Sequence, residues 1–142
     1  MSEKVVVRQN RDFLTEILAT DPHRPGDSKL YPVEHLYHLT PYGMLLASLG
    51  TCTAIVLHTY AQHHGVDLEE VELRLSYERI FADDCRDCEA IDTYEEQIVE
   101  EIALKGHLSP QERQKLLLIA RHCPIHKMLH QGIEVVSHLS ES

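Results

Sequence analysis

Two cysteines in unlike sequence settings are the residues best suited to chemistry in this chain. Cys52 lies in the small-residue, apolar stretch Ala47–Ala54, and Cys123 lies in the segment Arg121-His-Cys-Pro-Ile-His126. A cysteine thiolate is a strong nucleophile, a metal ligand and the form that is oxidised to a sulfenic acid. The sequence therefore points first to thiol chemistry at these two positions.

The setting of Cys52 is the middle of an apolar helical pattern. A helix dipole stabilises a thiolate only within the end turns, so activation of Cys52 requires a nearby cation. The competing interpretation is structural, because a free cysteine often serves as a small hydrophobic core residue.

Cys123 precedes a proline, which disfavours the helical conformation for the cysteine itself. If Pro124 begins a short helical turn, Cys123 is its N-cap, and its sulfur faces unpaired N–H groups at the positive end of the dipole. His122 and His126 flank it. The alternative is a buried cysteine at the end of a helix, with no reactive role.

Cys85 and Cys88 form a Cys-x-x-Cys pair in an acidic segment. Such a pair suits two ligands of a tetrahedral zinc site or a redox pair. A closed zinc site needs four ligands, and no second pair with matching spacing exists in the sequence. Three interpretations remain open: an inert acidic loop, a facultative disulfide, and a metal site. The inert loop is favoured, so no metal ligands are included among the predicted site residues.

The charge balance excludes some classes of partner. The formal net charge is −10, from 23 acidic and 13 basic residues. Because nucleic acids and anionic membranes are bound through basic surfaces, neither is an expected partner. No Walker A, Gly-x-Gly-x-x-Gly, Gly-x-Ser-x-Gly or His-Glu-x-x-His motif is present, so we predict no cofactor.

The length of 142 residues fits one domain spanning 1–142. The first residues have neither a basic region nor a long apolar run, so we expect no signal peptide and a cytoplasmic location. The longest apolar stretch, Pro41–Ala61, contains polar residues and is interpreted as a buried helix.

The elements that position the cysteines begin with N-terminal strands in residues 1–39. Lys4–Arg8 and Phe13–Thr20 flank a polar turn, which predicts a hairpin, and a third short strand is expected within 30–39. A long helix carrying Cys52 is then expected at 40–65. Thr40 is a good N-cap, Pro41 suits the first helical position, and Gly65 is a natural stop.

Residues 66–142 are expected to supply two more strands, a second helix and a final strand. Val71–Phe81 alternates strictly, and Ile91–Leu104, ending at Gly106, is interpreted as its paired strand. Ser109 and Glu112 form a capping box that starts the second helix, which Pro124 ends or bends. A last strand is predicted at Ile133–Leu139. The order β-β-(β)-α-β-β-α-β is mixed, so the predicted class is α+β.

Several of these segments together resemble one protein family. The chain is similar to the OsmC/Ohr family of osmotically inducible and organic hydroperoxide resistance proteins, over roughly residues 40–139. Within the family it resembles the OsmC-like subtype. The resemblance rests on Thr40-Pro-Tyr-Gly-Met-Leu-Leu-Ala-Ser-Leu-Gly-Thr-Cys-Thr-Ala54, Tyr60-Ala61, Gly65-Val66, Asp84-Cys85 with Cys88, Leu104-Lys-Gly106 and Cys123-Pro-Ile-His126.

The resemblance implies an intertwined homodimer with a long central helix and an active site at each subunit interface. It implies a thiol-dependent peroxidase that reduces organic hydroperoxides. Cys52 would attack the O–O bond and become a sulfenic acid, and Cys123 would resolve it as a disulfide. A thiol or dithiol reductant would then restore the enzyme. Two rivals remain: different thiol chemistry at the same site, and binding of a small apolar ligand with idle cysteines.

The chain departs from the family pattern beside Pro41. Peroxidase members carry a Glu there that, with an Arg, orients and activates the thiolate, whereas this chain has Tyr42 and Gly43. The activating Arg comes from the N-terminal region, and Arg11 is the first candidate. The further candidates are Arg8 and Arg24.

Overall fold

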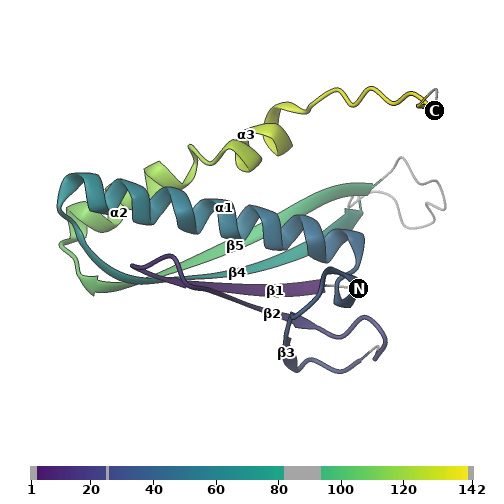
Figure 1. Cartoon of the computed structure of the whole chain (residues 1–142), viewed down its shortest axis with the longest axis horizontal. Helices are drawn as coiled ribbons and strands as arrows, with labels where there is room; N and C mark the ends of the chain where they lie inside the picture. Colours follow the sequence, from purple (N-terminus) through teal and green to yellow (C-terminus); the bar gives the residue numbers. More distant parts are fainter. Residues whose placement is uncertain (1–2, 25, 82–93, 141–142) are drawn as a thin grey trace.

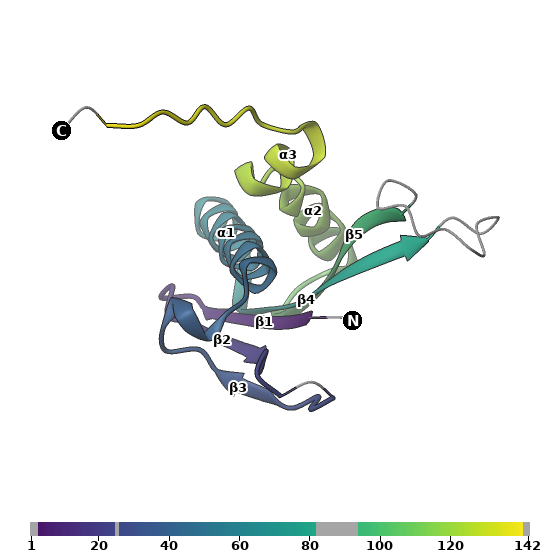
Figure 2. The same ribbon diagram turned by 90° about the vertical axis from the view of Figure 1, so that its right-hand side faces the viewer.

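One antiparallel sheet carries the helices on a single face (Figures 1 and 2). The computed structural model describes residues 3–24, 26–81 and 94–140. Its strands are β1 (Glu3–Asn10), β2 (Thr15–Thr20), β3 (Leu30–Pro32), β4 (Asp67–Phe81) and β5 (Tyr94–His107). Its helices are α1 (Pro41–His64), α2 (Pro110–Ala120) and α3 (Pro124–Gln131), with a 3-10 turn at Leu36–His38.

The strand order is β3-β2-β1-β4-β5, and every neighbouring pair is antiparallel. The predicted N-terminal hairpin is confirmed by the β1–β2 pairing, and the third short strand by β3. The predicted pairing of the two long strands is also confirmed, with Leu73 opposite Ile102. β5 runs one residue beyond Gly106, the expected stop, and ends at His107.

The long helix α1 lies across β1 and β4 and supplies much of the core. Gly50 is where the helix comes closest to the sheet, because a Cβ there would lie 2.8 Å from both Leu75 Cδ1 and Val7 Cγ2. The small residues of Ala47–Ala54 that face the sheet are therefore covered by this chain's own strands. They give no independent reason to expect a partner.

α1 is also the one helix among the described residues that is long and apolar enough to span a membrane. Half of its most apolar window is buried within the chain. Leu46 and Leu57, both 0% exposed, lie on the buried side against the sheet core. The prediction of a buried helix at this position is confirmed.

The C-terminal region differs from the prediction in two ways. Pro124 starts a separate eight-residue helix, α3, which the predicted element order did not contain. The predicted strand Ile133–Leu139 is wrong for the single chain, because these residues form an extended, exposed segment without ladder pairing. The segment leads away from the sheet and helices in Figure 2. A strand needs a neighbouring edge, and alternation in sequence does not provide one.

Candidate functional site

The position of Cys52 follows from the way α1 begins and ends. The Thr40 hydroxyl accepts a hydrogen bond from the Gly43 N–H at 3.1 Å, and Pro41 occupies the first turn. Gly65 ends the helix in the left-handed conformation with a φ of 64°. Cys52 therefore lies mid-helix, as predicted. It is partly exposed and packs against the core.

Cys123 is positioned by the junction between α2 and α3. The capping box at the start of α2 is confirmed, with reciprocal hydrogen bonds between Ser109 and Glu112 at 2.9 and 3.1 Å. After α2 ends, Cys123 becomes the N-cap residue of α3, as the sequence suggested, although its side chain makes no capping hydrogen bond. Cys123 is 0% exposed and belongs to the main core cluster.

The two cysteines meet where α1 packs against α3. The Cys52 and Cys123 thiols are neighbours that interact with each other, and the backbone N–H of Ile125 also interacts with the Cys52 thiol. Both thiols are free in this structure. Residues that are 71 positions apart in the sequence thus form one dithiol pair.

The environment of Cys52 opposes ionisation. Burial, the Cys123 thiol and the negative charge of Glu100 raise the pKa of Cys52 to about 11, and the Ile125 N–H only partly compensates. No cation is among the described groups that shift this pKa. Cys52 is therefore a protonated thiol at neutral pH in the single chain, not the thiolate that the family resemblance implied.

Glu100 on β5 is a site residue that the sequence analysis missed. It lies on the helix-facing side of the sheet, and its carboxylate accepts a 3.4 Å hydrogen bond from the Thr53 hydroxyl. Burial raises the pKa of the Glu100 carboxyl. The available signal was strand alternation, because Ile98 and Ile102 flank Glu100 at two-residue spacing and share its face.

A cavity of about 360 Å³ adjoins this carboxyl between α1, the β4–β5 hairpin and α3. Its apolar walls come from α1, β5 and α3. Its polar groups include Glu100, whose negative charge acts on the Cys52 thiol. The apolar lining residues are Leu45, Leu49, Ile98 and Leu129.

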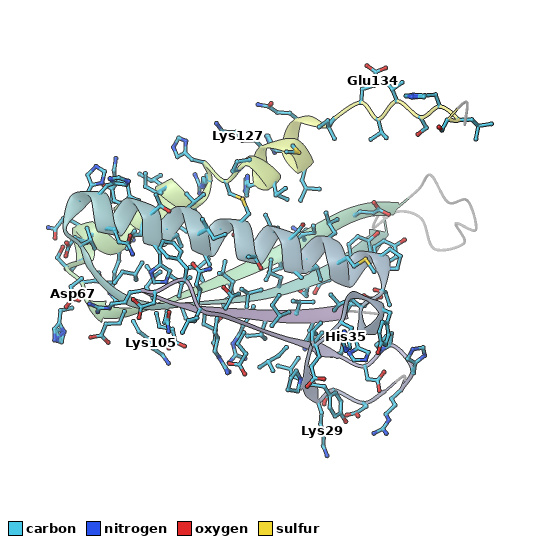
Figure 3. The ribbon with its side chains drawn as sticks, in the orientation of Figure 1. Lys29, His35, Asp67, Lys105, Lys127 and Glu134 are labelled. Atoms are coloured by element: carbon cyan, nitrogen blue, oxygen red, sulfur yellow. The ribbon has the colours of Figure 1, made fainter. Side chains whose placement is uncertain are left out.

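The structure places Arg11 away from the thiol pair in the single chain. Arg11 forms an ion pair with Asp67 at 3.1 Å, and its backbone oxygen accepts a hydrogen bond from Gln62 near the C-terminal end of α1. Gln62 is ten residues beyond Cys52, which is about 15 Å along the helix axis. Asp67 is labelled in Figure 3 at the end of the sheet remote from His35.

The other two candidate arginines are paired with carboxylates. Arg8 forms ion pairs with Glu72 at 2.5 Å and Glu16 at 3.4 Å. Arg24 lies 3.6 Å from Asp21 within its own loop. In the single chain, the described contacts of these arginines lead to acidic side chains and not to Cys52.

Two further sequence features have separate outcomes. Tyr42, which stands beside Pro41 where peroxidase members have Glu, stacks on Tyr77 with ring centroids 4.5 Å apart. Cys85 and Cys88 lie outside the described residues. The side chains of Asp67, Glu69 and His107, which lie close enough to share a cation, are exposed.

Comparisons with known proteins identify the family and the fold. The family model described as OsmC-like protein matches residues 34–138, well over half of the chain. A solved structure of an OsmC-like hydroperoxide resistance protein from Jannaschia sp. CCS1 is similar in fold, with a TM-score of 0.60 and 16% sequence identity. The match covers 98% of this chain and 93% of that chain. No curated protein sequence matches. The chain belongs to the OsmC-like family.

Proposed function

We propose that the chain is a thiol-dependent peroxidase that reduces organic hydroperoxides through Cys52 and Cys123. The observation that carries the proposal is the contact of these two thiols at the α1–α3 junction, beside a partly apolar cavity of about 360 Å³. Membership of the OsmC-like family supports it, and a solved protein of similar fold is described as a hydroperoxide resistance protein.

The roles of the two thiols follow from their exposure. Cys52 is partly exposed and can be reached by a small molecule, whereas Cys123 is 0% exposed. The Cys52 sulfur attacks the terminal oxygen of the hydroperoxide, so that an S–O bond forms, the O–O bond breaks and an alcohol leaves. The Cys123 sulfur then attacks the Cys52 sulfenic acid, giving a disulfide and water. A thiol or dithiol reductant reduces the disulfide by exchange.

A second candidate function is favoured by the raised pKa of the Cys52 thiol. In this alternative the cavity binds a small apolar ligand or supports different thiol chemistry, and no peroxide is reduced. Retention of a bound apolar ligand by a Cys52→Ser variant, together with an absence of peroxide turnover in the unaltered protein, would favour this alternative.

We further propose a homodimer. Residues 132–140 extend away from the fold, and Glu134 marks this segment in Figure 3. A second copy is the proposed cover, because four apolar side chains on so short a segment are otherwise left in water. They are Ile133, Val135, Val136 and Leu139, which are 67%, 80%, 78% and 95% exposed.

Sedimentation tests the dimer. We expect the unaltered chain to sediment as a dimer at micromolar concentration, and a Val135→Asp/Leu139→Asp variant to sediment as a folded monomer. A folded monomer for the unaltered chain would refute the dimer.

Single-turnover consumption of cumene hydroperoxide tests the peroxidase. Cys52→Ser is expected to abolish consumption, because a serine hydroxyl is hardly ionised and is a poor nucleophile. Cys123→Ser is expected to consume one equivalent, to accumulate a Cys52 sulfenic acid and to over-oxidise under excess hydroperoxide. If Cys123→Ser alone eliminates the first turnover, the roles are reversed. If neither substitution does, the chain is not a cysteine peroxidase.

A further inference from the structure

Glu100 breaks the pattern of the strand that carries it. On β5, the residues facing the helices include Ile98, Ile102 and Leu104, which pack against the core. Glu100 occupies the same row, opposite Leu75, which is 2% exposed. A carboxyl in an apolar row loses hydration, and this cost needs a compensating role.

The local hydrogen bonding does not satisfy this carboxyl well. The Thr53 hydroxyl donates to the Leu49 backbone oxygen at 2.8 Å, and Glu100 Oε2 lies farther away, at 3.4 Å. Because a hydroxyl has only one proton to donate, the shorter bond takes most of it. Burial therefore dominates, and the pKa of Glu100 is raised.

Several titratable groups surround Glu100 from the packed elements. Cys52 lies on α1, and Cys123 lies at the N-cap of α3. The remaining groups line the same cavity. They are Tyr77 on β4, Glu96 on β5, and His126 and His130 on α3.

We propose that Glu100 is the catalytic acid–base group that relays a proton between the Cys52 thiol and the peroxide. The inference deepens the proposed function and rests on it. The Glu100 carboxylate accepts the Cys52 thiol proton. As the Cys52 sulfur forms its bond to the terminal peroxide oxygen, the O–O bond breaks, and its electron pair leaves with the alkoxide. Glu100 gives its proton to that alkoxide, so the products are a sulfenic acid, an alcohol and a carboxylate.

This relay accounts for activity without a stable thiolate. In the productive state, Glu100 is a carboxylate and Cys52 is a protonated thiol, so the two groups together carry one proton. This state predominates above the raised pKa of Glu100 and below the pKa of Cys52, about 11. Within that range the rate of Cys52 oxidation should be independent of pH. Without the carboxyl, only the Cys52 thiolate reacts. At pH values below the thiol pKa, the thiolate concentration increases tenfold for each unit by which the pH is raised.

The test is the pH profile of Cys52 oxidation by cumene hydroperoxide in the Cys123→Ser background. The parent is expected to show a plateau through neutral pH. Adding Glu100→Gln, which preserves side-chain size, should remove the plateau. The rate should then be at least tenfold lower at pH 7 and should rise about tenfold per pH unit toward pH 10.

A matched substitution separates this role from general charge effects. Glu101→Gln alters the neighbouring, exposed carboxyl of the same strand. It is expected to leave the rate of Cys52 oxidation and the plateau unchanged. An unchanged plateau in Glu100→Gln would overturn the inference while leaving the peroxidase proposal intact. So would loss of the plateau in His126→Gln but not in Glu100→Gln. No oxidation of the parent at any pH would overturn both.

Discussion

Two polar side chains lie between α1 and the sheet, His58 on the helix and Glu100 on β5, and the fold satisfies their hydrogen-bonding groups differently. His58 is 1% exposed, and its Nε2 lies 2.8 Å from the Gln9 backbone oxygen, a short hydrogen bond to the central strand. Glu100, on the side toward α3, has a 3.4 Å contact with Thr53 and lies beside Cys52. The first group is held by a strong partner, and the second is not.

The difference separates a structural region from a reactive one. A buried group with a short hydrogen bond fixes the register of helix on sheet and has little reason to exchange its proton. A half-buried carboxyl with a poor hydrogen-bond partner, near a thiol whose pKa is also raised, is poised to exchange a proton. α1 therefore anchors the fold through its sheet side and exposes chemistry on the side that faces α3.

The largest expected effect is a loss of stability when a core side chain on the sheet side of α1 is truncated. Leu46 is 0% exposed on the sheet side, and Leu129 is 43% exposed on α3. Leu46→Ala should lower the free energy of unfolding by about 2–5 kcal/mol, because it leaves a cavity in the core. Leu129→Ala should change it by no more than about 0.5 kcal/mol. Denaturant unfolding measures both, and similar losses would contradict the comparison.

The next effect is acid destabilisation through His58. Burial, with the nearby positive charge of Arg11, lowers the pKa of His58 below its ordinary value. The neutral form is favoured in the folded state, so its stabilisation is complete above about pH 6.5 and is lost as pH falls through the folded pKa. Thermal unfolding between pH 7.5 and 5 should show a smaller loss in His58→Gln than in the unaltered protein. His64→Gln, at an exposed position, should change nothing.

The pH dependence of stability that comes from Glu100 should have the opposite sign to that from His58. Its pKa is raised by burial, so its stabilising contribution is complete below the ordinary Glu pKa and is lost as pH rises through the folded value. Glu100→Gln should therefore raise the thermal midpoint at pH 7.5, with the gain vanishing near pH 4. The exposed neighbour control, Glu101→Gln, should show no gain. A destabilised Glu100→Gln at pH 7.5 would mean that the carboxyl is structural.

The smallest expected effect is a loss of stability at alkaline pH, caused by ionisation of the Cys52 thiol. Because the pKa of Cys52 is raised to about 11, its contribution to stability is complete below the ordinary thiol pKa of about 8.5 and is lost as pH approaches 11. Cys52→Ser lacks this titration, so its stability should decline less between pH 8.5 and 10.5. Chemical denaturation measures the stability of both proteins. Equal declines would show that the pKa of the Cys52 thiol is not raised.

Local sequence signals predicted α1 and α2 well, although α3 was absent from the predicted element order. Thr40, Pro41 and Gly65 mark α1, and Ser109 with Glu112 marks α2, because caps act within one helical turn. The strand predicted at Ile133–Leu139 failed because pairing depends on a distant edge.

The candidate site shows the same division. The sequence identified both cysteines, because each has a distinctive local motif. It could not place Arg11, which lies in the β1–β2 turn, because sequence spacing does not show which end of α1 that turn contacts. It missed Glu100, although alternation with Ile98 and Ile102 set that carboxyl on the inner face. A single acidic residue in an apolar row was the available signal.

The most direct measurement of the central claim is thiol mapping by mass spectrometry after one equivalent of cumene hydroperoxide. The chain contains four cysteines, so the Cys85→Ser/Cys88→Ser variant, expected to keep full activity, removes competing pairs. The account predicts that the hydroperoxide is consumed and that the peptides containing Cys52 and Cys123 become linked by a disulfide. If the hydroperoxide is consumed while both thiols remain free, or if the linked pair never forms, the account is contradicted.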